Sequence, residues 1–284
     1  MWFYDAVASG FQYPTDPARL QAFRMAFGAV LTVRFAVAFT SGGWSRFAPG
    51  QIQAALARRR HGATRARVLF VVYRPLLVLR VLAAPALALG VAPHLALLIV
   101  LAGAAMEFAY LRSPSAVRYT VLTGTCLLLA GNLGNGLALN HTPSHANTWA
   151  QCLLVLITTD IYLNSAWQKI RSHQFRSGLY LAQFIHTYAH VKGQLVHRHQ
   201  FAIPSPVQRH LGNLTAREIR IWRMLSVIVI AVEIALPVGL LLPQSLPYAV
   251  AAGVAMHAAF LCLKPVQLVT FSGLVTTSYL AFAP

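Results

Sequence analysis

Charged residues are scarce in this chain, which argues against a soluble protein. Only 10% of the 284 residues are Asp, Glu, Lys or Arg, and the mean hydropathy is +0.58. Several runs of about 20 residues carry few charges or none, and a helix needs that length to cross a bilayer. We expect an all-α, polytopic helical membrane bundle with short interfacial helices, forming a single transmembrane domain over residues 1–284.

Cysteine, linker sequence and repeats are also nearly absent. Cys126, Cys152 and Cys262 lie in apolar runs without paired spacing, so we expect packed small side chains and neither a disulfide nor a zinc site. There is no Pro/Gly/Ser-rich linker, low-complexity tract or internal repeat. The first 20 residues mix charges with aromatics, and no cleavable signal is expected.

The net charge of +17 suggests nucleic acid as a partner, but the positions of the charges argue against it. The basic residues concentrate in segments 41–67 and 169–217. Cytoplasmic loops of membrane proteins carry such an excess of Lys and Arg, which binds anionic lipid headgroups. We therefore predict a cell-membrane location, the lipid bilayer as a partner, no nucleic acid, and both segments on the cytoplasmic side.

About eight apolar segments have the length and hydropathy of membrane spans. The predicted spans are 23–40, 68–90, 94–111, 116–137, 149–169, 222–242, 247–263 and 265–282. This count makes the basic loops alternate sides consistently, with the Lys- and Arg-free loop 140–147 facing away from the cytoplasm. Short helices are expected over 51–60, at the interface, and over 178–191, interfacial or re-entrant.

Several ionisable side chains fall within these spans, where charge is costly. Arg74 and Arg80 in the second span can pair with Glu107 in the third, or line a polar cavity. Glu233 and His257 occupy the neighbouring sixth and seventh spans. For each group a paired structural role and a functional role both remain open.

Lys169 ends the fifth span, and two interpretations of it remain open. A lysine at a helix end commonly extends its ammonium to the headgroups. A desolvated amine, whose charged form is disfavoured, could instead act as a base. Asp160 and Asn164 share one helical face with Trp167 by their spacing. Lys169 lies about half a turn from Asp160, so we expect it to have a separate partner or none.

The sequence around Lys169 resembles a known signature. Residues Ile161–Ile170 (IYLNSAWQKI), followed by Phe175 and Gly178, resemble the vitamin K-dependent gamma-carboxylase family, whose bacterial members are called horizontally transferred transmembrane domain proteins. In that family a tyrosine-containing helix ends in lysine, an aliphatic residue, a short linker, an aromatic and a glycine. The linker here is slightly longer.

Two further segments resemble the same family, and the resemblance extends over roughly residues 17–282. Met256–Leu261 with the later Phe271–Gly273 is similar to its histidine-containing helix. The Asn140–His141 pair is similar to its asparagine–histidine dipeptide, although His145 and Asn147 compete for that assignment.

The resemblance implies oxygen-dependent quinone chemistry without a metal. In the family mechanism a neutral lysine amine, here Lys169, deprotonates a reduced quinone; oxygen adds, and the resulting strong base removes a carbon-bound proton. Carbon dioxide then captures the carbanion, in a pocket that excludes water. By the same resemblance His257 and His141 would donate hydrogen bonds to the quinone. Residues assigned to cofactor binding are Asn140, Trp167 and Tyr162, and those assigned to a polar cavity are Asp160, Asn164, Glu233, Glu107 and Arg74.

The substrate is left open between a peptide and a small molecule. The large extramembrane region of animal carboxylases is absent, so a small secreted peptide or a co-encoded soluble protein is the expected partner. The alternative is a non-catalytic or accessory membrane protein for peptide-toxin maturation, export or immunity. His186 and His190, with His197 and His199 beyond them, could hold a metal, but no carboxylate or cysteine nearby completes a site.

Overall fold

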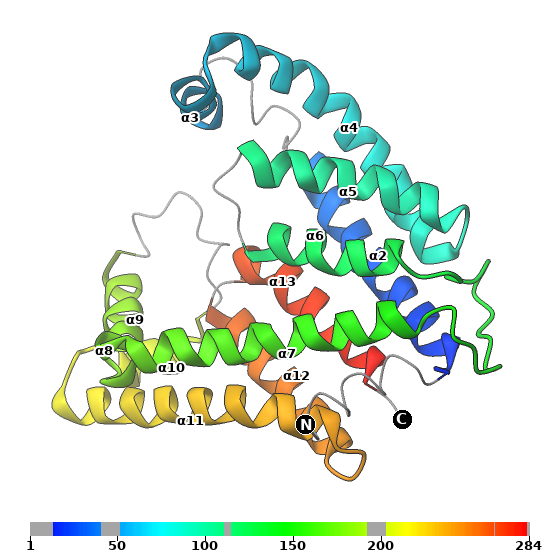
Figure 1. Ribbon diagram of the computed structural model, residues 1–284. Helices are drawn as coiled ribbons and strands as arrows, with labels where there is room; N and C mark the ends of the chain where they lie inside the picture. The colour runs from blue at the N-terminus through cyan, green and yellow to red at the C-terminus, as the bar shows by residue number, and fades with distance from the viewer. Residues whose placement is uncertain (1–13, 41–51, 111–114, 192–202, 264, 283–284) are drawn as a thin grey trace. The chain divides into compact units, whose positions relative to one another are not determined.

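The computed structural model describes residues 14–40, 52–110, 115–191, 203–263 and 265–282 (Figure 1). Most of these residues are helical, and no strand occurs among them beyond one isolated bridge. They group into two compact units, Met1–Val155 and Leu156–Pro284, which are described separately below. The single domain expected over 1–284 stays a prediction.

The first unit is a set of consecutive helices. They are α2 (Pro17–Thr40), α3 (Ile52–His61), α4 (Ala63–Leu89), α5 (Pro93–Tyr110), α6 (Ser115–Leu128) and the start of α7 (Thr148–Arg171). Helix α4 packs against both α2 and α5, and α5 packs against α6. Gly90, with φ of 72°, ends α4 in the left-handed conformation that glycine adopts without strain.

Helix α2 supplies much of the buried interior of this unit. Its buried apolar residues recur every three or four positions, as one helical face requires: Leu20, Phe23, Phe27, Leu31 and Phe35. Gly28 lets α2 approach α4 closely, because a Cβ at this position would overlap the backbone of Ala88. The expected short helix at 51–60 is present as α3, and its placement at the membrane interface stays a prediction. Residues 41–51 of the predicted basic segment lie outside the described residues.

The predicted span 116–137 is wrong in its second half. Helix α6 ends at Leu128, and the chain then runs without regular structure to residue 147. The side chain of Asn132 accepts a hydrogen bond from the backbone of Gly134, an asparagine turn that competes with helix. Gly134 has a φ of 70°. The asparagine turn and the positive φ of Gly134 therefore break the helix here.

The irregular segment 129–147 lies at the end of the unit where α4 ends and α2 and α5 begin. His94, near the start of α5, is 3.0 Å from the carbonyl of Ala130. The backbone N–H of Gly136 donates to the carbonyl of Gly90, and Thr15 and Ser144 exchange two backbone hydrogen bonds. Helix α6 thus traverses the unit, although it has only 14 residues.

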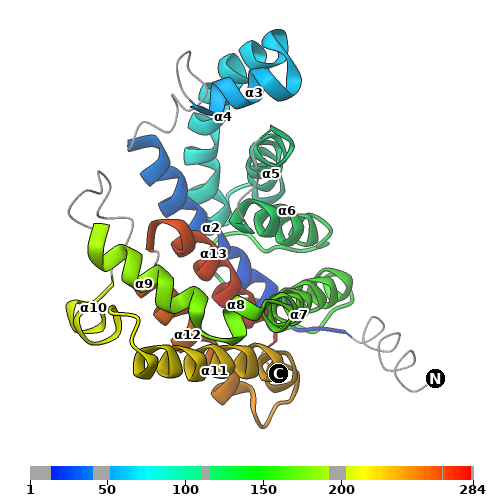
Figure 2. The same ribbon diagram turned by 90° about the vertical axis from the view of Figure 1, so that its left-hand side faces the viewer.

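The second unit contains the rest of α7 and all later helices. They are α8 (His173–Arg176), α9 (Leu179–Val191), α10 (Ser205–Leu211), α11 (Ala216–Leu241), α12 (Leu246–Leu263), α13 (Pro265–Thr277) and the 3₁₀ turn η3 (Ser278–Ala281). Successive helices α11, α12 and α13 pack against one another (Figure 2). The expected short helix at 178–191 is confirmed as α9, and its placement at the interface or within the membrane stays a prediction.

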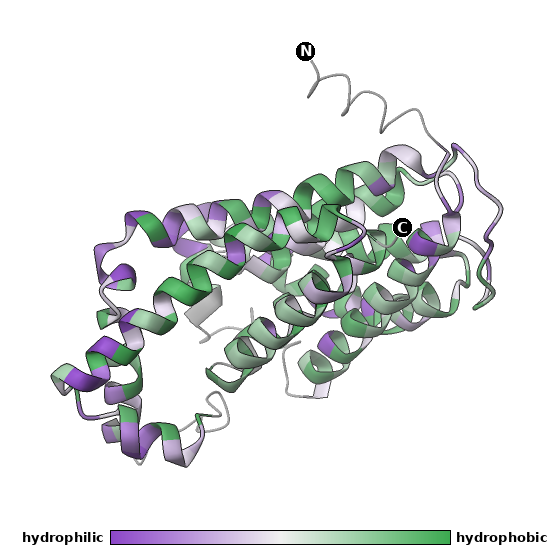
Figure 3. Ribbon diagram, turned by 90° about the horizontal axis from the view of Figure 1, so that it is seen from below, coloured by the Kyte–Doolittle hydropathy of each residue, from purple (hydrophilic) through white to green (hydrophobic). Residues whose placement is uncertain are grey.

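Five helices in the described residues are long and apolar enough to cross a membrane: α2, α4, α5, α11 and α12. Many large aliphatic side chains on them are exposed, among them Val71, Leu82 and Val238. Hydrophobic colouring follows the middle parts of the helices, with hydrophilic residues gathered toward their ends (Figure 3). This pattern fits an all-α membrane protein. Helices α6, α7 and α13 are not among the five, and the count of eight spans stays a prediction.

Candidate functional site

One face of α7 carries three polar side chains in the second unit. Tyr162, Ser165 and Lys169 are spaced by three and four residues, which places them in one row along the helix. Tyr162 is buried, and the side chain of Lys169 is only 20% exposed. Polar groups of α11, α12, α13 and η3 meet this row, forming two clusters.

The first cluster joins Lys169, Ser165 and Glu233, and we call it the Lys169 cluster. Lys169 Nζ donates to Ser165 Oγ at 2.7 Å and forms an ion pair with Glu233 Oε1. Ser165 Oγ donates to the same carboxylate oxygen at 2.9 Å. Glu233 is 3% exposed. The side chain of Lys169 therefore ends at a buried carboxylate. Helical spacing predicted a partner other than Asp160 or none, and the partner is Glu233.

Glu233 retains unused hydrogen-bonding capacity. Its Oε1 accepts two hydrogen bonds, whereas its buried Oε2 accepts none from the described residues. Pro237 follows one turn later and has no N–H to donate to the backbone carbonyl of Glu233. Buried acceptors in proteins are nearly always satisfied, so an unused one marks a place where another donor can bind.

Aromatic rings surround the ammonium of Lys169. Its Nζ lies 5.6 Å from the centre of the Phe175 ring and 5.8 Å from that of Phe260 on α12. Phe175 is positioned by α8, whose first turn is capped by Ser172 through a hydrogen bond from the Phe175 N–H. The linker between Lys169 and Phe175 thus folds so that the Phe175 ring lies next to the Lys169 ammonium.

Gly178, the last residue of the signature, has a structural explanation. Its φ is +78°, and a Cβ there would overlap the backbone of Trp222 and Arg223 on α11. Glycine is the residue that tolerates both conditions. It allows the chain to turn from α8 into α9 directly against α11, the helix that carries Glu233.

The second cluster, which we call the Tyr162 cluster, contains Tyr162, His257, Ser272 and Tyr279. His257 Nε2 is 2.9 Å from Tyr162 Oη, and its Nδ1 is 3.1 Å from Ser272 Oγ. Tyr162 Oη also bonds the hydroxyl of Tyr279. Each member can both donate and accept a proton. The cluster is therefore a continuous buried chain of groups through which a proton could pass.

Phe260 lies beside both clusters. Its ring is 5.9 Å from the His257 ring, and the Lys169 ammonium lies on it as described above. The ring of Phe271 is 6.2 Å from His257. The two polar clusters are thus bordered by aromatic carbon, which is the environment that strengthens electrostatic interactions by keeping water out.

The other predicted residues of α7 lie away from these clusters. Asp160, Asn164 and Trp167 are exposed, so the helical face they share is the outer one. Asn164 accepts a hydrogen bond from Gln168, and the guanidinium of Arg171 lies 5.1 Å from the Trp167 ring. Their predicted roles in a cavity and in cofactor binding stay predictions.

Asn140 and His141 belong to the first unit. The backbone N–H of Asn140 donates to Gln21, and His141 Nδ1 lies 3.1 Å from Asp16 on a side chain that is 71% exposed. Slight burial raises the pKa of Asp16, but the hydrogen bonds from Ala18 and His141 outweigh this effect and bring the pKa below its ordinary 3.8. The two residues help to hold the segment 129–147 to the start of α2, and their predicted quinone contacts stay predictions.

Glu107 is the centre of a buried charge cluster in the first unit. It pairs with Arg80 at 2.7 Å and with Arg34 at 2.9 Å, and Tyr73 donates to it at 3.3 Å. The guanidinium of Arg80 also lies 4.0 Å from the centre of the Phe35 ring. The predicted pairing of Arg80 with Glu107 is confirmed. Arg74 is exposed, and its role stays a prediction.

No group of three or more potential ligands for a metal ion occurs among the described residues. His186 and His190 lie one turn apart on α9, with ring centres 4.1 Å apart. Each Nδ1 is bonded to a backbone carbonyl, of Gly212 and of His186 respectively. His197 and His199 lie outside the described residues. The three cysteines are free.

Sequence reasoning missed several partners: Arg34, Tyr73, Ser165, Ser272 and Tyr279. Ser165 had a usable signal, because it lies one turn before Lys169 on the same face of α7. The others are joined to their partners by contacts between helices, which helical periodicity does not report. Comparison of the chain with known protein families, with curated proteins and with solved structures found no match.

Proposed function

We propose that this chain is a membrane enzyme in which Lys169, paired with Glu233, is the base toward a reduced quinone in an oxygen-dependent reaction on a peptide or small molecule. The main support is the ion pair between Lys169 and Glu233. The Glu233 residue is 3% exposed, and its second carboxylate oxygen has no donor among the described residues. The resemblance of Ile161–Ile170, Phe175 and Gly178 to the carboxylase signature supports the choice of chemistry.

In this proposal Glu233 accepts the proton that Lys169 must lose before it can act as a base. An ammonium has no lone pair, so Lys169 must transfer its proton to another group before it can act as a base. If the proton moves from Lys169 Nζ to Glu233, the products are a free amine and a carboxylic acid. Neither product carries a charge, so the exchange removes both desolvation costs of the buried pair. The amine can then accept a proton from an acidic hydroxyl.

The residues around Lys169 fit a reduced quinone. Phe175 and Phe260 offer apolar ring faces, and Glu233 Oε2 is a buried acceptor without a donor among the described residues. A quinol has two hydroxyl donors on an aromatic ring, and with oxygen it would supply the strong base that the reaction needs. At the edge of this site, His257 and Tyr162 would carry a proton or donate a hydrogen bond to the bound quinol.

A second function is favoured by the same ion pair. Buried intramembrane charges are commonly paired for structural reasons, and this pair joins α7 to α11. In that case the chain is a non-catalytic or accessory membrane protein for maturation, export or immunity of a peptide toxin. Carbon dioxide as a co-substrate belongs only to the enzymatic proposal.

The test uses purified protein in nanodiscs supplied with a reduced naphthoquinone and oxygen, with quinone epoxide measured by chromatography. We expect epoxide from the wild type, none from Lys169→Ala, and a strong loss in Glu233→Gln, which keeps an acceptor oxygen but cannot take the proton. Leu163→Ala, at an exposed position of α7, is the matched control. Epoxide from Glu233→Gln at the wild-type rate would reject the proton exchange, and no epoxide from any folded variant with several quinols would favour the accessory function.

A further inference from the structure

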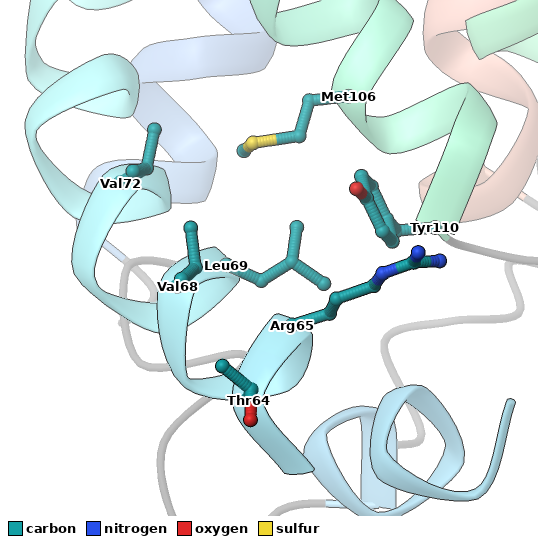
Figure 4. Close-up of a pocket in the computed structure, with 7 residues that line it drawn as sticks. All are labelled: Thr64, Arg65, Val68, Leu69, Val72, Met106 and Tyr110. Atoms are coloured by element: carbon teal, nitrogen blue, oxygen red, sulfur yellow. The ribbon is translucent and has the colours of Figure 1, made fainter. Parts of the chain in front are cut away.

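A cleft in the first unit lies apart from both polar clusters. It is formed by Thr64, Arg65, Val68, Leu69 and Val72 at the start of α4, and by Met106 and Tyr110 at the end of α5 (Figure 4). Its volume is about 190 Å³. One water occupies about 30 Å³ of liquid, so the cleft is too large for a single water molecule.

The walls of the cleft are mostly apolar. Leu69 is buried and packs with Met106 and Tyr110 in a small hydrophobic cluster, which gives the cleft a fixed floor. Val68 and Val72 on the same helical face are 56% and 43% exposed. These exposed valines belong to a helix apolar enough to span a membrane. The cleft therefore suits a hydrocarbon chain.

The polar end of the cleft is strongly basic. Arg65 lines the cleft and extends from α4 toward Tyr110 (Figure 4). The exposed arginines Arg58, Arg59 and Arg60 end α3, just before Gly62 turns the chain into α4. This end of the unit thus gathers cations on both sides of a turn.

No ion pair among the described residues gives these cations an acidic partner. The sequence has no Asp or Glu from residue 17 to residue 106. Of the described acidic residues in this unit, Asp16 is bound by Ala18 and His141, and Glu107 by Arg80 and Arg34. No carboxylate among the described residues pairs with Arg65. The charge is therefore complementary to an anion that comes from outside the chain.

We propose that the cleft between α4 and α5 binds one acyl chain of an anionic membrane phospholipid, whose phosphate is bound by Arg65. The apolar walls take the chain, and the guanidinium offers paired N–H donors that match phosphate oxygens. A free phosphate would make no contact with the apolar walls. A lipid without net charge would not balance the positive charge of Arg65. This site goes beyond the proposed function and does not depend on Lys169.

The test measures retained lipid by native mass spectrometry on detergent-purified protein titrated with phosphatidylglycerol or with phosphatidylcholine of the same chains. We expect one phosphatidylglycerol to bind preferentially and Arg65→Ala to weaken it about fivefold, as expected for one cation at a lipid phosphate. Arg67→Ala removes the same charge two residues away, outside the cleft lining, and should change binding less than twofold. Val68→Trp should block the bound chain, and glycerol phosphate without chains should not compete.

Three results would overturn the proposal. Equal weakening by Arg65→Ala and Arg67→Ala would mean a diffuse basic surface without a site. Equal binding of the two lipids would remove the role of the net negative charge of the headgroup. Unchanged phosphatidylglycerol binding in Val68→Trp would remove the role of the cleft, and monodisperse elution with wild-type helicity shows for each variant that the protein is folded.

Discussion

At the residue scale, the chemistry of Lys169 depends on what surrounds its ammonium. The side chain ends between two aromatic rings and beside a carboxylate with little contact to solvent. Removing one member of a buried ion pair leaves the other charge without compensation, whereas removing both does not. The stability of variants therefore reports whether the pair of Lys169 and Glu233 is shielded from water, and this measurement does not depend on any activity.

We predict that Lys169→Met lowers the free energy of unfolding by about 3 kcal/mol, because Glu233 is then left as an unpaired buried charge. The double variant Lys169→Met/Glu233→Gln should recover most of this loss. Thermal unfolding in detergent, compared across the two single variants and the double variant, measures the coupling. Additive effects of the two single changes would contradict a direct interaction between these side chains.

A second prediction concerns Gly253 on α12. A Cβ at this position would overlap the hydroxyl and ring of Tyr279, so Gly253→Ala should displace Tyr279 from Tyr162 and cost about 1–3 kcal/mol. Gly124→Ala is the matched control, because its Cβ would meet flexible side-chain atoms of Leu101 and Leu97 and no backbone or ring. Thermal unfolding should separate the two variants. Equal melting temperatures would show that Tyr279 can move without loss.

Single residues show how far the sequence alone could lead. The pairing of Arg80 with Glu107 was predictable, because two opposite charges in neighbouring apolar segments have few other partners. The pairing of Lys169 with Glu233 was not, because the two residues are 64 positions apart and several residues could have faced either one. Helical spacing states which residues share a face, and packing between helices decides what that face meets.

At the element scale, the end of α4 is held by a side chain from α2. Arg24 is fully buried and donates to the carbonyl of Leu87 at 3.0 Å and to that of Gly136 at 2.7 Å. The first bond adds a second donor to the Leu87 carbonyl at the helix end, which also accepts from the Gly90 N–H. The second fixes the segment after α6 to the same place.

We predict that Arg24→Lys destabilises the first unit by about 2 kcal/mol, because one ammonium cannot reach both carbonyls as the planar guanidinium does. Arg19→Lys makes the same exchange at a partly exposed position and should have a smaller effect. The variant Arg24→Lys should also be cut faster by protease within 129–147. Cleavage at the wild-type rate would contradict the anchoring role of Arg24.

The start of α2 should respond to acid. The folded-state pKa of Asp16 lies below its ordinary 3.8, so its contribution is complete above about pH 4 and is lost as pH falls through the folded value. The stability difference between wild type and Asp16→Asn should therefore shrink as pH falls from about 5 to about 3. Its size should stay below about 1 kcal/mol, because the pair with His141 is solvent-exposed. A constant difference across this range would contradict the depressed pKa.

The elements themselves were predictable to different degrees. The long apolar segments became α2, α4, α5, α11 and α12, because hydropathy over 18 or more residues identifies such helices strongly. Average hydropathy predicts that the helix continues from Leu128 to residue 137. The asparagine side chains and the positive φ of Gly134 and Gly136 decide against helix there, and these are local effects that average hydropathy does not contain.

At the scale of the whole molecule, the number of crossings is open to a direct test. Within the first unit, α6 brings the segment 129–147 to the end opposite α3. If α2, α4 and α5 cross the membrane, α6 must then cross it as well. A count of five crossings from the longest helices alone would put residue 145 and residue 59 on the same side.

We predict that these two positions lie on opposite sides. Single cysteines introduced as His145→Cys and Arg59→Cys, in a chain whose three native cysteines are replaced by serine, report the side through a membrane-impermeant thiol reagent. His145→Cys should react in intact cells, and Arg59→Cys only after permeabilisation, because basic segments stay in the cytoplasm. Reaction of both in intact cells, or of neither, would contradict a crossing by α6.

The anchoring of Arg24 also sets an order for biosynthesis. Its acceptors, Leu87 and Gly136, are synthesised 63 and 112 residues later. The ribosome therefore delivers the first apolar segment before either carbonyl acceptor of Arg24 exists, and an unpaired charge in an apolar segment is costly in lipid. The nascent segment must be retained near water or the insertion machinery until α4 and the segment after α6 have emerged. Truncation before residue 136 should then leave α2 poorly inserted, although every residue of that helix is already present.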